Sequence, residues 1–553
     1  MKTYEVVAEA LAAQEVDTVF SLMTSDNMSM LSRLEKQGVT IVRTRTECGA
    51  VAMADGYARA TGRAGVVSIG AGPSVAMAGT ALVTARKRRS PLVVIAGDAP
   101  VGERHHLKYF EQHRFFENTA GHCVTVTASR DVVADAFEVF RRAVGGEGPA
   151  VLNIAVDLLE SELPSSELED LTRYMAAAAR PEPMVPTEAP LRRAVEMLQA
   201  AERPVIVAGR GATDERSRLA MQTIGERLGA LYGSSLQGQY LFGGPHDVGL
   251  VGTLGTSSSI RAMTETDCAL VVGASLNGYT AGHGQLFQDA EIIHVDRRSE
   301  AFGAETPVDL ALCGDAAETL EALVALLSDA DGPRTGFREP ELVAQIAEDF
   351  QAIDEYEPVG GRLDQRQVLD TLGAALPAQR RVVVDAGHFA FFVIDHIRLA
   401  NPTERIWTAD FASIGLAVSI GIGVATASPE AATVVFVGDG GFAMSLAELD
   451  TAVRHRIPMT FIVMDDGAYG AELRYLENRR EEDHLARFTS PSWADIASAY
   501  GCRAVTVRTL EELEAACDLI GQDDGPLLLD VKVDATVANR QFRGRTTSAA
   551  GAK

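Results

Sequence analysis

Residues 435–475, VFVGDGGFAMSLAELDTAVRHRIPMTFIVMDDGAYGAELRY, decide the fold of this chain. They contain an apolar run, a Gly-Asp-Gly turn, a helical pattern, a second apolar run and an acidic turn. This order predicts a strand–helix–strand unit with parallel strands, whose carboxyl ends meet at one edge of a sheet. Asp439 and Asp466 each follow one of those ends, so we expect the two carboxylates to lie close together.

Two carboxylates at a strand edge suit a magnesium ion, which prefers carboxylate, phosphate and water oxygens. The backbone carbonyl of Ala468 is a candidate third ligand. Amides that no side chain covers stand at the start of the predicted helix, at Gly438, Gly440 and Gly441. Free amides at a helix start favour a phosphate. The block therefore predicts a site for a metal-bound diphosphate, with an ordinary glycine turn as the alternative.

A second block, from Arg45 to Ala85, reads RTECGAVAMADGYARATGRAGVVSIGAGPSVAMAGTALVTA. Its first half predicts a helix that begins at Glu47 and contains many small residues, which permit close packing. A carboxylate at a helix start also complements the helix dipole, so a purely structural role for Glu47 is the alternative.

The two blocks, in this order, resemble the thiamine diphosphate (ThDP) enzymes. The spacing from Asp439 to Asp466 and the Gly56-Tyr57-Ala58-Arg59 run after Glu47 carry the resemblance. It implies that Asp439, Asp466 and the Ala468 carbonyl bind Mg²⁺. It also implies that Glu47 hydrogen-bonds the aminopyrimidine of ThDP and activates it. The family usually has Asn where this chain has Asp466, so we expect an unusually strong dependence of cofactor binding on the metal.

The same resemblance assigns further residues around the cofactor. It implies that Ile414 wedges between the two rings of ThDP and that the Ala412 carbonyl accepts a hydrogen bond from the pyrimidine amino group. A core position for Ile414 in an apolar helix is the alternative. Other positions expected at the cofactor are Gly387, His388, Tyr469 and Gly470.

Several polar residues are candidates for catalysis or for the substrate pocket. Glu472 resembles a glutamate that pyruvate-type decarboxylases place over the thiazolium, although an exposed glutamate paired with Arg474 or Arg479 is the alternative. Gln112 lies in a segment similar to the Phe-Gln-Glu segment of acetolactate synthases, with the two polar residues exchanged. The predicted pocket positions are Ser25, Asp26, His105 and His106.

The middle of the chain gives no nucleotide signature. The Gly209-Arg210-Gly211 turn follows a predicted strand, but a full GxGxxG and an acidic ribose partner are missing, which argues against a nicotinamide cofactor. The segment GASLNGYT lacks the arginine that flavin-binding acetolactate synthases carry, and the AGHGQL run resembles benzaldehyde lyase. We therefore expect a structural central domain and regard FAD as unlikely.

Strand and helix patterns alternate along all 553 residues, which predicts an α/β fold. With the resemblance, we expect three doubly wound parallel-sheet domains. The predicted parts are a pyrimidine-binding domain (1–165), a central domain (188–328), a diphosphate-binding domain (362–536) and a tail (537–553). The second linker is predicted at about 329–361. The tail either lacks structure or folds over the site.

A formal charge of −26 argues against nucleic acid binding, which needs a basic surface. The six cysteines show no CxxC pairing and fit reduced thiols. No signal peptide or membrane-length apolar segment is evident. We therefore expect a cytoplasmic enzyme without membrane or nucleic acid partners.

The resemblance implies a ThDP- and Mg²⁺-dependent lyase or carboligase that acts on a 2-oxo acid or 2-hydroxy ketone through a ylid and an enamine. It also implies a homodimer or homotetramer in which Glu47 of one subunit meets the diphosphate domain of another. The alternatives are acetolactate synthase itself and a catalytically idle regulatory subunit. The sequence does not decide the substrate, the acceptor or the oligomeric state.

Overall fold

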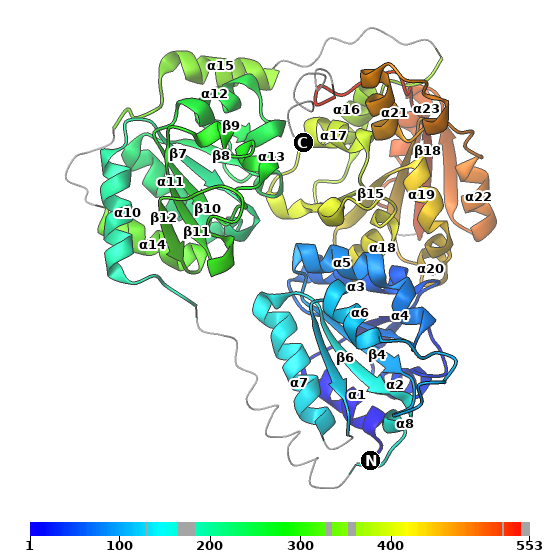
Figure 1. The fold of residues 1–553 in the computed structure, drawn as a ribbon. Helices are drawn as coiled ribbons and strands as arrows, with labels where there is room; N and C mark the ends of the chain where they lie inside the picture. The colour runs from blue at the N-terminus through cyan, green and yellow to red at the C-terminus, as the bar shows by residue number, and fades with distance from the viewer. Residues whose placement is uncertain (129–130, 164–182, 328–333, 352–360, 523–524, 543–553) are drawn as a thin grey trace. The chain divides into compact units, whose positions relative to one another are not determined.

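The computed structural model of this protein describes residues 1–128, 131–163, 183–327, 334–351, 361–522 and 525–542. These residues form three sheets of six parallel strands each, as Figure 1 shows in blue to cyan, green, and yellow to red. The predicted α/β class with three parallel-sheet domains is therefore confirmed. The inner strands of each sheet are buried almost throughout, as expected where helices cover both faces of a parallel sheet, and the edge strands are more exposed.

The N-terminal sheet has the strand order β2-β1-β3-β4-β6-β5. Its strands are β1 (Thr18–Ser21), β2 (Thr40–Arg43), β3 (Gly65–Ile69), β4 (Leu92–Asp98), β5 (His122–Val126) and β6 (Ala150–Ala155). Its helices are α1 (Thr3–Ala13), α2 (Met28–Lys36), α3 (Glu47–Thr61), α4 (Pro73–Met77), α5 (Gly79–Arg88), α6 (Gln112–Thr119), α7 (Val132–Arg142) and α8 (Val156–Leu159). Helix α3 begins at Glu47, as predicted.

The C-terminal sheet has the order β14-β13-β15-β16-β18-β17, which repeats the topology of the N-terminal sheet. Its strands are β13 (Arg380–Val384), β14 (Arg405–Trp407), β15 (Ala432–Gly438), β16 (Met459–Asp465), β17 (Arg503–Val507) and β18 (Pro526–Lys532). Its helices are α16 (Gln365–Ala375), α17 (His388–His396), α18 (Ala417–Ala427), α19 (Asp439–Ser445), α20 (Leu449–Arg454), α21 (Gly470–Arg479), α22 (Trp493–Tyr500) and α23 (Leu510–Cys517).

The central sheet has a different order, β12-β11-β10-β7-β8-β9. Its strands are β7 (Pro204–Ala208), β8 (Leu231–Ser234), β9 (Asp247–Leu250), β10 (Cys268–Val272), β11 (Glu291–Asp296) and β12 (Leu310–Cys313). Its helices are α10 (Glu188–Ala200), α11 (Glu215–Leu228), α12 (Ser257–Glu265), α13 (Gly278–Ala281), α14 (Ala316–Leu326) and α15 (Pro340–Gln351). Helix α15 lies inside the segment predicted as the second linker. It forms because Leu342 and Ile346, one turn apart, are buried in the core of the central domain.

The N-terminal and C-terminal domains form one compact unit, and the central domain, with Leu399–Arg405, forms another. Inside the first unit, α3 and α18 cross at close range and share one apolar core (Figure 1). Two glycines permit this approach. A Cβ on Gly56 would lie 2.0 Å from the Ile420 carbonyl oxygen, and one on Gly423 would lie 1.9 Å from that of Met53. The crossing therefore fixes α3 against the C-terminal domain.

Candidate active site

Asp439 and Asp466 meet at the carboxyl ends of β15 and β16, as predicted. The Asp439 carboxylate accepts hydrogen bonds from the Gly467 amide at 2.9 Å and from the Ser490 hydroxyl at 2.8 Å. The Asp466 carboxylate accepts one from the Ala468 amide at 3.0 Å. These bonds hold the Asp466 to Ala468 turn beside the start of α19.

Both aspartates carry raised pKa values in the metal-free protein. Burial raises the pKa of Asp439, and the neighbouring charge of Asp466 raises it further. Burial likewise raises the pKa of Asp466, with Asp465 adding to the effect. A divalent cation between the two carboxylates would remove this penalty, so the residues fit Mg²⁺. Among the described residues no three His, Cys, Asp or Glu side chains gather as a metal site. A metal here would therefore also rely on a carbonyl and on phosphate oxygens.

The glycines of the Gly-Asp-Gly turn have a packing role that the sequence did not reveal. A Cβ on Gly440 would lie 2.6 Å from the ring of Tyr469, and a Cβ on Gly441 would lie 2.5 Å from a carboxylate oxygen of Asp385. The neighbouring side chains thus leave no room for a Cβ atom at these two glycines. The Gly440 amide donates a hydrogen bond to the Asp439 carboxylate at 2.8 Å, at a helix start whose dipole favours a phosphate.

Asp385, at the end of β13, holds the loop that carries Ala412 and Ile414. Its carboxylate accepts hydrogen bonds from the Gly415 amide at 2.7 Å and from the Thr408 hydroxyl at 3.2 Å. Burial raises the pKa of Asp385 to about 6, although these hydrogen bonds act to lower it. Ala412 has a left-handed backbone with φ 57° and is exposed. Ile414 is half-buried and precedes α18, so it belongs to this loop rather than to the helix.

Glu47 is buried, with 8% of its surface exposed. Within the described ranges its carboxylate makes no hydrogen bond or ion pair. The preceding residue, Thr46, caps α3 by accepting the Gly49 amide at 2.9 Å. The Glu47 oxygens are not among the buried side-chain atoms that lack a hydrogen-bond partner, so the carboxylate is accessible to a ligand. This arrangement fits a residue that hydrogen-bonds a cofactor.

Glu448, which the sequence did not single out, anchors the start of α3. This buried residue of the C-terminal domain accepts hydrogen bonds from the Thr46 amide and the Thr46 hydroxyl, both at 2.8 Å. Its carboxylate also accepts hydrogen bonds from the Arg45 amide and the Thr451 hydroxyl. A Cβ on Gly49 would lie 2.1 Å from a carboxylate oxygen of Glu448, so glycine is required there. The position of Glu47 therefore depends on Glu448.

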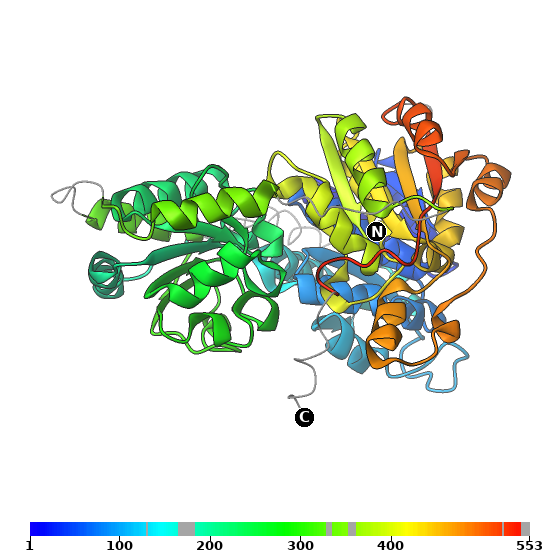
Figure 2. The same ribbon diagram turned by 90° about the horizontal axis from the view of Figure 1, so that it is seen from above.

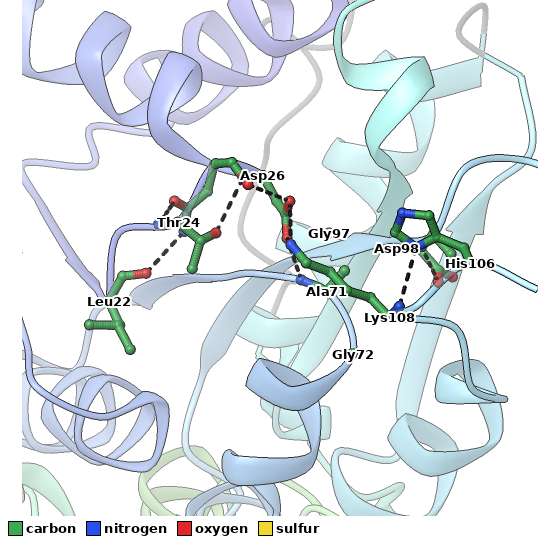
Figure 3. Close-up of polar contacts among 12 residues, drawn as sticks. Leu22, Thr24, Asp26, Ala71, Gly72, Gly97, Asp98, His106 and Lys108 are labelled. Atoms are coloured by element: carbon green, nitrogen blue, oxygen red, sulfur yellow. Dashed lines mark hydrogen bonds and ion pairs between the residues drawn. The ribbon is translucent and has the colours of Figure 1, made fainter.

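The predicted pocket residues lie at the carboxyl edge of the N-terminal sheet. Ser25 and His105 are exposed, and His106 is half-buried. Asp26 forms an ion pair with Lys108, 2.7 Å from its ammonium, and also accepts the Ala71 amide at 3.0 Å. Figure 3 shows the Lys108 side chain reaching Asp26 beside this amide. Sequence reasoning missed Lys108.

Gln112 is buried at the start of α6, and its amide group is bonded inside the domain. It donates to the Gly97 carbonyl at 2.7 Å and to the Asn153 side chain at 2.6 Å. Its oxygen accepts the Gly72 amide at 3.3 Å. These bonds use both of its N–H groups. A catalytic role for Gln112 stays a prediction.

Glu472 is exposed on α21. Arg474 pairs instead with Glu477 at 2.8 Å, and Arg479 stacks on Tyr475 at 4.3 Å from the ring centre. Within the described ranges Glu472 has no ion pair, so the structural alternative that paired it with one of these arginines is not seen.

His388 begins α17 after Gly387 and contacts the end of the described chain. Its Nε2 accepts the Asn539 amide at 3.0 Å, and the Phe542 ring lies 4.9 Å away, edge to face. Burial, assisted by the charge of Arg474, lowers the pKa of His388 to about 3, so the ring is neutral. Arg540 pairs with Asp395 of α17 at 3.0 Å. Figure 2 shows this end of the chain in red beside the C-terminal domain.

In the central domain, backbone packing fills the glycine turn after β7. A Cβ on Gly209 would lie 2.3 Å from Ala274 Cα. The strand order matches that of dinucleotide-binding folds, but a topology does not establish a ligand. The absence of a nucleotide from this domain stays a prediction. No helix in the described ranges is long and apolar enough to cross a membrane.

Family profiles match all three domains. The thiamine pyrophosphate enzyme N-terminal TPP binding domain matches residues 1–120, the central domain residues 191–323, and the C-terminal TPP binding domain residues 385–531. A sulfoacetaldehyde acetyltransferase of Alcaligenes xylosoxydans xylosoxydans is 28% identical, with 93% of this chain and 90% of the relative aligned. A probable 2-ketoarginine decarboxylase of Pseudomonas aeruginosa is 29% identical (92% and 90%). The large subunit of acetolactate synthase isozyme 2 of Escherichia coli is 27% identical (96% and 95%). The chain therefore belongs to the thiamine pyrophosphate (thiamine diphosphate) enzyme family and is a ThDP-dependent enzyme.

Proposed function

We propose that this enzyme uses ThDP and Mg²⁺ to break or form the carbon–carbon bond beside the carbonyl of a 2-oxo acid or 2-hydroxy ketone. The proposal rests on the presence of two features in the same chain. An aspartate pair, with Asp439 buried and Asp466 half-buried, stands at the carboxyl ends of β15 and β16, and the unpartnered, buried Glu47 starts α3. When bound, the cofactor supplies the electron sink for carbanion chemistry.

The residues of the chain bind and orient the cofactor in this proposal. Asp439, Asp466 and the Ala468 carbonyl hold the metal, and the start of α19 binds the diphosphate. Asp385 fixes the loop on which the Ala412 carbonyl and the Ile414 side chain approach the pyrimidine and the ring junction. Glu47 hydrogen-bonds the pyrimidine nitrogen, with its position set by Glu448.

The substrate class is supported by the relatives. One is described as a probable decarboxylase of 2-ketoarginine, which is a 2-oxo acid, and another as an acetolactate synthase. At 27–29% identity these names do not choose between substrates. Asp26 and Lys108 lie at the predicted pocket and bring an oppositely charged pair to it. We propose that the Lys108 ammonium keeps the Asp26 charge from repelling an anionic substrate.

We further propose that the active unit is a homodimer or homotetramer, in which Glu47 of one subunit reaches the cofactor held by a second subunit. Membership of the thiamine pyrophosphate enzyme family supports this, whereas Glu448 and the α3–α18 crossing fix only how α3 packs on its own C-terminal domain. The oligomeric state is measured by light scattering of the active fractions. Full activity in a monomeric fraction would contradict this arrangement.

A substrate screen tests the proposal. The holoenzyme is incubated with a panel of 2-oxo acids, with and without an acceptor aldehyde, and with pyruvate alone for acetolactate formation. Carbon dioxide release and ligation products are measured, with Glu47→Gln as the matched control. We expect product from the wild-type enzyme with at least one donor and a large loss in the variant. Equal turnover by both proteins would contradict the proposed role of Glu47.

A further inference from the structure

The C-terminal domain contains a cavity of about 430 Å³ at the carboxyl ends of β16, β17 and β18. Ligands of open parallel sheets bind at this kind of edge. Its wall includes Arg362, Asp465, Ser490, Ser492, Arg508 and Lys532. None of the glycines of the Gly-Asp-Gly turn lines it, but it adjoins the proposed metal site, because Ser490 of its wall donates a hydrogen bond to the Asp439 carboxylate at 2.8 Å. Its volume lies in the range of small-molecule sites.

Two arginines, Arg362 and Arg508, bring positive charge to the cavity wall, and the charge of Arg362 also partly offsets the effect of burial, which raises the pKa of the nearby Asp466. Arg362 donates from one nitrogen to the carbonyls of Asp465, at 3.1 Å, and Val533, at 3.3 Å. Neither Arg362 nor Arg508 forms an ion pair with a carboxylate among the residues that the structure describes. Both arginines are exposed and open to a ligand.

The remaining groups of the wall add donors rather than further net charge. Lys532 bridges two buried aspartates, at 2.9 Å from Asp530 and in direct contact with Asp465, so its charge is compensated. The Ser492 oxygen accepts the Asp495 amide at 3.3 Å as the cap of α22, which leaves the hydroxyl hydrogen as a donor. Helix α22 thus begins at the cavity wall, where the positive end of its dipole favours an anion.

We propose that this cavity binds a phosphorylated small molecule, with the phosphoryl group held between Arg362 and Arg508. Guanidinium groups bind phosphate through two parallel N–H bonds, and two of them match the charge of a phosphate dianion. The rest of the cavity accommodates the organic part of the ligand. The charge of −26 on the chain makes a nucleic acid strand an unsuitable occupant. This inference does not depend on the substrate of the ThDP site.

The experiment uses the holoenzyme saturated with ThDP and Mg²⁺, so that the diphosphate site is filled. Inorganic phosphate, ribose 5-phosphate and adenosine 5′-monophosphate are titrated separately by calorimetry in a phosphate-free buffer. We expect binding of at least one probe, weakened by added chloride. Arg362→Ala and Arg508→Ala should each weaken it by about tenfold or more. Equal affinity for all three probes would identify phosphate itself as the ligand, and tighter binding of an ester would identify a metabolite.

Arg141→Ala is the matched control, because Arg141 is an exposed arginine on α7 that pairs with Glu138 at 2.8 Å. It should bind the probe as the wild type does. Retained ThDP and an unchanged melting temperature show that the cavity variants are folded, and Arg508→Lys, which keeps the charge, should retain part of the affinity. Absence of binding by all three probes would overturn the proposal. So would binding that survives loss of both arginines.

Discussion

Gly56 offers a sharp test of the packing that positions Glu47. In Gly56→Ala the new Cβ would lie 2.0 Å from the Ile420 carbonyl oxygen, although real Cβ atoms essentially never approach within 3.0 Å. Helices α3 and α18 would therefore have to separate by about 1 Å or more. The obstacle is backbone, which cannot rotate away as a side chain can. The strain thus spreads through the core shared by the two domains.

The magnitude follows from two opposing effects. Alanine is favoured over glycine in a helix by about 0.8–1 kcal/mol. Overpacking a close-packed core costs about 1–3 kcal/mol, and more where backbone must move. The difference of the two effects is a loss of about 0–2 kcal/mol in the free energy of unfolding, and we expect Gly56→Ala near the upper end because the obstacle is backbone. Because α3 begins at Glu47, we also expect a loss of activity in the protein that remains folded.

Gly373→Ala is the matched control, since Gly373 also lies inside a helix. The nearest atom to its new Cβ is 3.6 Å away, which is an ordinary contact. This variant should gain about 0.5–1 kcal/mol of stability. Both variants are compared by urea unfolding followed by circular dichroism. If Gly56→Ala proves as stable as Gly373→Ala, the described crossing of α3 and α18 is wrong.

Three further predictions concern the site. Glu448→Ala should slow turnover and destabilise the protein by about 2 kcal/mol or more, because buried donors lose their acceptor; Glu448→Gln should recover part of both, and wild-type kinetics in Glu448→Ala would refute the anchoring of Glu47. Asp439 and Asp466 have raised pKa values, so the metal-free folded state holds protons that the unfolded chain releases. Its stability should therefore fall as the pH rises above about 4. Mg²⁺ with ThDP should accordingly raise the melting temperature more at pH 8 than at pH 6, and the slope should weaken in Asp439→Asn. Chelation should release ThDP. Lys108→Met should raise the KM for a 2-oxo acid without changing ThDP affinity, and adding Asp26→Asn should partly restore it; an unchanged KM in Lys108→Met would count against this role.

The parts of the fold that depend on local pattern could be predicted from the sequence. Strands β15 and β16 are apolar runs of strand length, and the turns after them carry glycine and aspartate. Parallel pairing then brings Asp439 and Asp466 to one edge without further information. The start of helix α3 at Glu47 could likewise be predicted from the local sequence.

The parts that depend on distant contacts could not be predicted. Glu448 meets Thr46 across 402 positions of the chain, and Lys108 meets Asp26 across 82. On sequence alone, each of these charged side chains looks like a solvated surface group. The glycines of the Gly-Asp-Gly turn could be assigned to the phosphate, but their contacts with Tyr469 and Asp385 required the structure. Helix α15 was missed although its sequence carries the signal, since Leu342 and Ile346 recur at helical spacing.

Deuterium exchange at C2 of bound ThDP tests the central claim most directly, because it reports on activation of the cofactor without any substrate. The holoenzyme is transferred to D₂O, quenched in acid at short times, and the C2 proton is read by NMR. We expect fast exchange in the wild type. In Glu47→Gln with ThDP and Mg²⁺ still bound, exchange should be slower by a factor of about 10²–10⁴. Exchange at the wild-type rate in that variant would contradict the account.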